Sequence, residues 1–147
     1  MNIEFFQCSI RYDKVMETGL LKKVTETYLV EALSYTEAEK RIMDEMSSYI
    51  SGEWEVSDIR RLRLAEVVES SDATADCWYK AKIAFITLDE KTGAERQTSQ
   101  ALLVQAPSFV EAVKALYSCM KGTLGDWIII SLGETKILDI FRYTESS

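Results

Sequence analysis

Residues 34–38 read Ser-Tyr-Thr-Glu-Ala, and residues 108–112 read Ser-Phe-Val-Glu-Ala. In each stretch a serine precedes a glutamate by three positions, which is the pattern of a capping box at the start of a helix. Gly52 and Gly122 are the stop signals that follow. Apolar residues spaced by three or four positions predict the buried faces of the two helices: Tyr35, Ala38, Ile42 and Met46, then Phe109, Ala112, Leu116 and Met120.

The similarity extends to both sides of these helix starts. At an offset of 73, residues 5–12 (FFQCSIRY) align with residues 78–85 (WYKAKIAF), aromatic on aromatic and Ile on Ile. After one inserted residue, Thr18-Gly19 aligns with Thr92-Gly93, and Glu53-Trp54 later aligns with Asp126-Trp127 at the first offset again. A match of this length indicates a tandem duplication. We assign the repeats to residues 1–69 and 77–147, joined by a Ser-rich, acidic linker at 70–76.

Each repeat has the signals of a strand hairpin before its helix. Residues 5–12 and 78–85 alternate apolar and polar side chains, as half-buried strands do, and Asp89 with Gly93 marks a hairpin turn. After the helix, strand-rich sequence runs from Trp54 to Val68 and from residue 127 to 141, with a break that divides it into two strands. We therefore predict an α+β fold: a duplicated ββαβ(β) unit, with an antiparallel sheet and one main helix per repeat, arranged as one pseudo-two-fold symmetric domain.

Composition excludes several classes of function. The chain has no histidine, which removes His-dependent triads, HExxH metalloproteases and the commonest general base. Three cysteines without a CxxC spacing do not indicate a disulfide framework or a thiolate zinc site. The net charge of −7 opposes binding to duplex nucleic acid and to anionic membranes. With no signal-peptide pattern and no apolar run of membrane-spanning length, we expect a cytoplasmic protein.

Three stretches carry a family resemblance: residues 22–34 (KKVTETYLVEALS), residues 50–53 (ISGE) and residues 85–91 (FITLDEK). The chain resembles, over nearly its whole length, a domain-of-unknown-function family of gut bacteria and their phages or mobile elements. The resemblance implies a small cytosolic protein. It implies no enzymatic activity.

Two kinds of residue are candidates for a binding surface. Arg61 and Arg63 would share a strand face with Ile59 and could hold phosphates. A solvated strand face explains them better, because the second repeat has no equivalent arginines and the net charge opposes binding. Trp54 and Trp127 occupy equivalent places in the repeats. They could stack a ligand, but a role as core anchors explains their duplication better.

No residues form a catalytic, cofactor or metal signature. The carboxylates of the two hairpins, such as Asp13 with Glu17 and Asp89 with Glu90, fit turn chemistry. Cys77 and Cys119 fit small buried hydrophobes, because no histidine is present to activate a thiol.

We therefore expect a non-enzymatic interaction or regulatory protein without cofactors. Most of the net negative charge lies in the first repeat, which suits an acidic surface that binds another, basic protein. The alternative is a small-ligand or nucleotide-binding module with a pocket between the two repeats. The sequence leaves the oligomeric state open.

Overall fold

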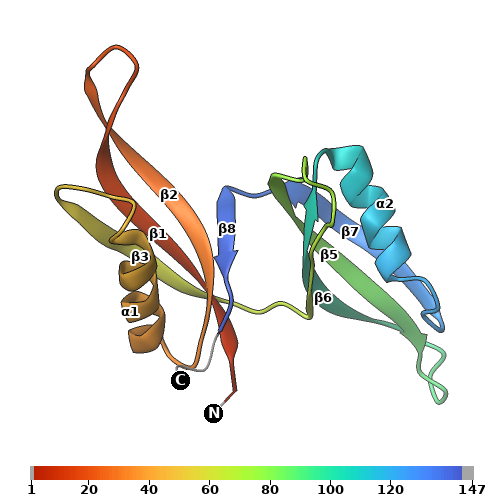
Figure 1. The fold of residues 1–147 in the computed structure, drawn as a ribbon. Coiled ribbons are helices and arrows are strands. Elements are labelled where there is room, and N and C mark those ends of the chain that lie inside the picture. The colour runs from red at the N-terminus through yellow and green to blue at the C-terminus, as the bar shows by residue number, and fades with distance from the viewer. Residues whose placement is uncertain (1, 144–147) are drawn as a thin grey trace. The chain divides into compact units, whose positions relative to one another are not determined.

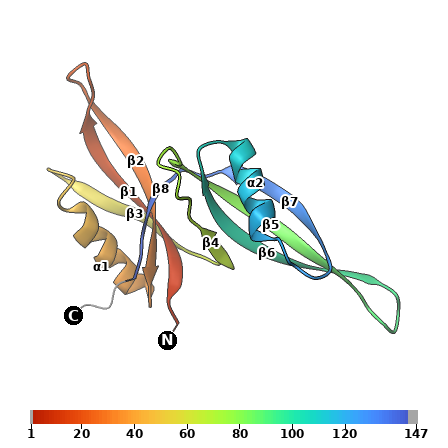
Figure 2. The ribbon, with the colours of Figure 1, turned by 45° about the vertical axis from the view of Figure 1, so that its right-hand side comes forward.

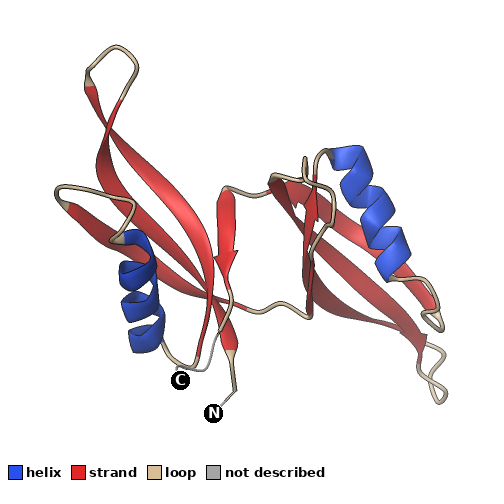
Figure 3. Ribbon diagram, viewed as in Figure 1, coloured by secondary structure: helices blue, strands red, loops and turns tan. Residues whose placement is uncertain are grey.

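The computed structural model describes residues 2–143. Within this range the elements follow the order β1 (Glu4–Val15), β2 (Leu21–Ala32), α1 (Tyr35–Met46), β3 (Trp54–Leu62), β4 (Glu66–Val68), β5 (Cys77–Leu88), β6 (Glu95–Ala106), α2 (Phe109–Cys119), β7 (Asp126–Glu134) and β8 (Ile137–Phe141). The strands form two four-stranded sheets, in the orders β3-β1-β2-β8 and β4-β6-β5-β7, and one helix packs on each sheet (Figures 1 and 3). The predicted α+β fold of duplicated ββαβ units is confirmed.

Each sheet is built around a long hairpin that gains a third, antiparallel strand on the side of its first strand. In the first sheet β3 pairs with β1, and in the second β7 pairs with β5. Both pairings contain a register shift, between Ser9 and Ile10 in the first and between Lys82 and Ile83 in the second. These positions correspond at the offset of 73, so the duplication has kept the local irregularity of the strand as well as its order.

The fourth strand of each sheet comes from the other repeat. Strand β8, at the end of the second repeat, pairs in parallel with β2 of the first, from Thr27 to Val30. Strand β4, at the end of the first repeat, pairs in parallel with residues 102–104 of β6 (Figure 2). The first compact unit therefore comprises the chain up to Arg63 and from Lys136 onward, and the second comprises Leu64–Thr135. The boundaries of the two compact units therefore differ from those of the two sequence repeats, because each repeat contributes its last strand to the other unit.

Segment 70–76 lies within the second unit and connects β4 to β5. Asp72 Oδ1 accepts a hydrogen bond from the backbone N–H of Thr74 at 2.8 Å, which forms a turn of the Asx type. The side chain of Gln105 binds the segment at both ends, accepting from Ser70 N and donating to Ala75 O, each at 3.0 Å. The links between the units are instead the short connections from β3 to β4 and from β7 to β8.

The helices begin where their capping boxes place them. Ser34 Oγ accepts a hydrogen bond from Glu37 N at 3.1 Å, and Glu37 Oε1 accepts one from Leu33 N at 3.0 Å. The serine of the second box, Ser108, caps Glu111 N at 3.3 Å. The end of α1 differs from expectation, because the helix finishes at Met46, more than a full turn before Gly52, whereas α2 ends at Cys119, close to Gly122.

The core of the first unit lies between α1 and one face of its sheet. It is formed by buried side chains from β1, β2 and the helix: Phe6, Cys8, Ile10, Tyr28, Val30, Ala32, Ala38, Ile42 and Met46. The second unit repeats this arrangement in two adjoining clusters. Their buried members are Ala81, Ile83, Leu102, Leu116 and Met120, and then Tyr79, Val104, Ala106 and Ala112.

Two residues predicted on the buried helix faces are only partly covered. Tyr35 is 47% exposed and Phe109 is 51% exposed, and each stands at the first position of its helix. Their rings still contact the core edge-on: Tyr35 lies 4.9 Å from Phe6, and Phe109 lies 6.2 Å from Tyr79, measured between ring centroids. The same aromatic pair is thus present in both repeats.

Candidate functional site

Arg61 is held inside its own unit. Its Nε lies 3.1 Å from Glu4 Oε2, and its guanidinium carbon lies 5.4 Å from the ring centroid of Tyr35 and 5.9 Å from that of Phe6. An ion pair combined with two cation–π contacts fixes the side chain over the end of the core. Its positive charge is largely matched by Glu4, which leaves little of it for a phosphate.

Arg63 does not share a strand face with Arg61. Strand β3 ends at Leu62, so Arg63 lies in the connection to β4, where it is exposed. The preceding Arg60 pairs with Asp58 at 2.7 Å. The three arginines consequently face different surroundings, and the structure does not assemble them into a stripe.

The two tryptophans occupy equivalent, half-buried positions. Trp54 stands opposite Tyr12 and packs against the first core, and Trp127 stands opposite Phe85 and packs against the second. The ring of Trp127 also lies 5.3 Å from that of Tyr117 on α2. The packing of each tryptophan therefore fixes the start of its strand, β3 or β7, to the core of its own unit.

Trp54 in addition lines a small hollow on the first unit, of about 240 Å³. Apart from Tyr12, the other lining residues carry charges of both signs, and Arg11 Nη1 lies 3.8 Å from Glu55 Oε1. A second hollow, of about 390 Å³, lies beside the start of α2 and is lined by segment 68–72 and residues of β6 and α2. Neither hollow contains a nucleophile paired with a base.

The thiols are held in their protonated form. Burial, and then the charge of Asp58, raises the pKa of Cys8 to about 12. A hydrogen bond to the Glu134 carboxylate is the main cause that raises the pKa of the half-buried Cys77 to about 11. Burial also raises the pKa of Cys119, whose Sγ lies 3.3 Å from Glu66 Oε2. Thiolate nucleophiles are therefore disfavoured at all three positions.

Among the described residues, no three Cys, Asp or Glu side chains gather in a way that could hold a metal ion. In the same part of the chain, no helix has the length and apolar character needed to cross a bilayer. The polar chemistry of the structure is that of turns, caps and surface ion pairs.

The clearest exposed apolar feature is the tip of the β1–β2 hairpin, which we call the arm (residues 13–23). Strand β3 pairs with β1 only as far as Tyr12, so the arm is a two-stranded ribbon that extends beyond the sheet (Figure 1). Its turn closes with hydrogen bonds from Met16 N to Leu20 O (2.9 Å) and from Gly19 N to Met16 O (2.8 Å). Gly19 has φ +84°, a conformation that favours glycine.

Four apolar side chains of the arm face solvent: Val15 is 67% exposed, Met16 38%, Leu20 71% and Leu21 67%. Val15 and Leu21 are directly opposite each other across the two strands, and so are Lys14 and Lys22. A cross-strand pair of like charges destabilises a hairpin, and grouped exposed apolar side chains are uncommon on soluble monomers. The arm thus departs from what folding alone favours.

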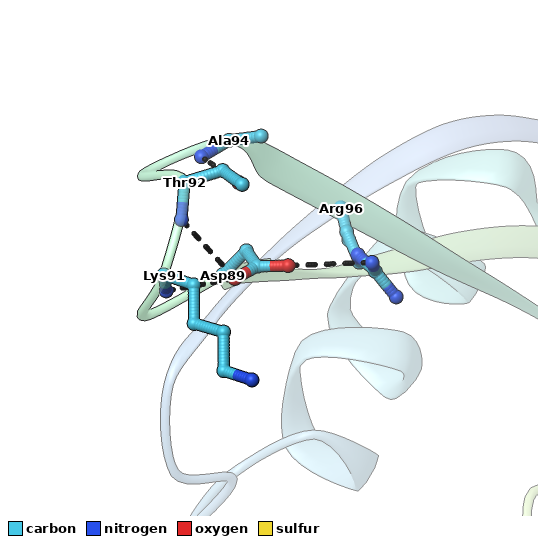
Figure 4. A network of polar contacts seen from close by, with 5 residues as sticks. All are labelled: Asp89, Lys91, Thr92, Ala94 and Arg96. Atoms are coloured by element: carbon cyan, nitrogen blue, oxygen red, sulfur yellow. Dashed lines mark hydrogen bonds and ion pairs between the residues drawn. The ribbon is translucent and has the colours of Figure 1, made fainter.

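In the equivalent hairpin of the second unit, the polar groups of the turn form hydrogen bonds with one another. Asp89 Oδ1 accepts hydrogen bonds from the N–H groups of Lys91 (2.8 Å) and Thr92 (3.3 Å), while Oδ2 lies 3.3 Å from an Arg96 nitrogen (Figure 4). Ala94 N donates to Thr92 Oγ1 at 3.3 Å. Where the arm has Leu20 and Leu21, this tip has Ala94 and Glu95. Leu88, which aligns with Val15, is 67% exposed like Val15, so the two hairpins share this apolar residue. The additional exposed apolar residues, Met16, Leu20 and Leu21, are specific to the first repeat.

Comparison with protein families gives one match, to a domain of unknown function, DUF4494, over residues 4–143. The chain belongs to this family. The match covers both repeats and both exchanged strands, so the family unit is the whole duplicated fold. A comparison with curated proteins gives no match.

The sequence analysis singled out Trp54, Trp127, Arg61 and Arg63. Trp54 and the two arginines belong to the first unit and Trp127 to the second, and each tryptophan packs against the core of its own unit. The sequence analysis did not identify the arm as a candidate site. The signal was present in the sequence, because Leu20-Leu21 follows Thr18-Gly19 whereas Ala94-Glu95 follows the aligned Thr92-Gly93. Only the burial of each side chain separates such residues from ordinary strand positions.

Proposed function

We propose that this is a non-enzymatic interaction protein that holds a protein partner through the arm. The observation that carries the proposal is the contrast between the two hairpins. The turn of the second hairpin is closed by hydrogen bonds of Asp89 and the hairpin exposes one large apolar side chain at its tip, Leu88, whereas the arm exposes four. Large exposed apolar residues grouped on a protruding element are typical of interaction sites.

The apolar tip is large enough to contribute to binding. Burying the exposed parts of Leu20 and Leu21 would supply on the order of 3 kcal/mol, at about 25 cal/mol per Å². Val15, with two-thirds of its surface exposed, adds to this. A few residues at the centre of a contact often carry most of its energy.

Charge favours a basic partner. Within the arm, Lys14, Lys22 and Lys23 are largely offset by Asp13 and Glu17, so the local contact is mainly apolar. The chain as a whole carries −7, and its field would attract a positively charged protein and speed association. A regulatory role, a cytoplasmic location and an origin in gut bacteria, phages or mobile elements are finer parts of the same proposal.

Site-specific photo-crosslinking tests the proposal. A photoreactive residue at position 20 should give one discrete adduct in an extract of the source organism, and the same residue at position 94 should not. The substitutions Leu20→Ala and Leu21→Glu, which copy the second hairpin, should remove complex formation while leaving the fold intact. If this double variant forms the same complex as the wild type, the arm is not the contact. If a panel of nucleotides and metabolites raises the melting temperature instead, ligand binding replaces the proposal.

A further inference from the structure

The two outer antiparallel strands, β3 and β7, are equivalent in position but differ in their exposed side chains. Both are edge strands of their sheets within the described residues. On β7, Trp127, Ile129 and Leu132 pack against the second core, while Ile128 (41%) and Ile130 (44%) are exposed. An edge strand with exposed apolar residues is a template for pairing with another strand.

Strand β3 is protected against such pairing. The residues aligned with Ile128 and Ile130 are Glu55 and Ser57, both exposed. Two further charges follow on β3, Asp58 and Arg60, where β7 has a serine and a glycine. Charged side chains on an edge are a common device against strand addition. Because both edges keep the same length and the same register shift, the loss of these charges is the main difference between them.

We infer that β7 binds an extended segment of a protein partner, which adds to the sheet as a further strand. The segment would have an apolar centre and a basic residue near each end. The two charged residues of β7 specify this partner, since Asp126 and Glu134 stand at its opposite ends, both exposed. A segment with cations at both ends matches the two carboxylates whichever direction it runs.

A second copy of the chain fits this edge poorly. Antiparallel pairing of two β7 strands about Ile130 would place Asp126 of one opposite Glu134 of the other, and parallel pairing would bring identical carboxylates together. Like charges directly opposite each other destabilise a strand pair. Each copy also carries −7, which adds repulsion between them. The charge pattern therefore favours a basic segment over self-association.

This site lies on the second unit and uses none of the residues of the arm, so it stands independently of the proposed function. It uses backbone hydrogen bonds for affinity and the exposed isoleucines and terminal carboxylates for selectivity.

Peptide binding to the full chain provides the test. The probe is a labelled nine-residue peptide, Lys-Lys-Val-Thr-Val-Thr-Val-Lys-Lys, followed by fluorescence anisotropy. Two control peptides separate strand addition from general attraction to an acidic protein. One replaces the central valine by proline and keeps the charge, and the other replaces all four lysines by glutamate. We expect both to bind at least 10-fold more weakly, and we expect the β7 amides to exchange more slowly when the first peptide is bound.

Variants of the chain complete the test. Ile128→Glu with Ile130→Ser, which copies β3, should weaken binding of the lysine peptide at least 10-fold, whereas Leu20→Ala with Leu21→Glu should leave it unchanged. Asp126→Lys with Glu134→Lys should reverse the preference toward the glutamate peptide, and this holds even if the isoleucine variant folds poorly. The inference is overturned if the proline peptide binds as tightly as the first, if the charge variant keeps the original preference, or if the wild type dimerises through β7.

Discussion

Replacing Phe141 by alanine should release β8 from the first sheet. The strand is short and pairs with β2 along one side only. Near its C-terminal end it makes a stacked pair, in which the ring of Phe141 lies 5.4 Å from that of Tyr28, while Ile137 at its start is buried. Arg142 Nη1 adds an ion pair with Glu31 at 3.3 Å, and Arg41 donates a hydrogen bond to the Arg142 carbonyl at 2.6 Å.

The size of the effect follows from these contacts. Truncating a fully buried phenylalanine costs about 3–5 kcal/mol. Phe141 is half-buried, so roughly half of that cost, including the lost stacking, gives about 2 kcal/mol. Leu138 on the same strand is 52% exposed, and Leu138→Ala should cost less than about 0.5 kcal/mol.

Hydrogen exchange is the suitable assay, because two units need not unfold in one transition. A loss of about 2 kcal/mol should speed the exchange of β8 amides and of their β2 partners, Thr27–Val30, about 30-fold. Amides of β5 and β6 should be unaffected. The reasoning fails if Phe141→Ala leaves β8 exchange at the wild-type rate, or if Leu138→Ala speeds it equally.

Four further predictions concern the residues singled out from the sequence, binding to duplex DNA, and the buried thiol. Trp54→Ala and Trp127→Ala should each lower the free energy of unfolding by about 2–4 kcal/mol, since both rings pack against a core; unchanged denaturant midpoints would show that they serve binding instead. Arg61→Ala should cost about 1–2 kcal/mol through its lost ion pair and cation–π contacts, and Arg63→Ala almost nothing. A gel shift at physiological salt should show no appreciable binding of the wild type to duplex DNA. Sub-micromolar, salt-sensitive binding that disappears when Arg61→Ala and Arg63→Ala are combined would contradict this. The pKa of Cys8 is raised to about 12 in the folded state, so its contribution to stability is complete below the unfolded pKa near 9 and is lost as the pH rises toward 12; Cys8→Ala should flatten that part of the stability profile, and an identical profile would refute the assignment.

Sequence patterns predicted the elements that depend on local chemistry. The capping serines stand where expected, with Ser34 and Ser108 accepting hydrogen bonds from the glutamate N–H three residues later. The hairpin of the second repeat has the expected Asp89 and positive-φ Gly93. These features depend on a few neighbouring residues, so a single sequence is enough to show them.

The features that the sequence did not predict depend on residues far apart in the chain. A repeat alignment shows that β4 and β8 correspond, but nothing local indicates that each pairs with the sheet of the other repeat. The same holds for Arg61, whose partner Glu4 is brought next to it only by the pairing of β1 with β3. The different exposure of the two hairpins and of β3 and β7 likewise required the burial of each side chain.

The crossed pairing of β4 and β8 restricts how this protein can have arisen and how it can be divided. In a single ancestral repeat, the outer edge of the second strand would have been unpaired. Two such chains could have completed each other's sheets by exchanging their last strands, as in domain swapping. Fusion into one gene makes both strand exchanges intramolecular, so that each strand is present at a high effective concentration beside the sheet that it joins. Cutting the chain between the repeats would therefore yield two incomplete halves, which should regain full sheets only when mixed.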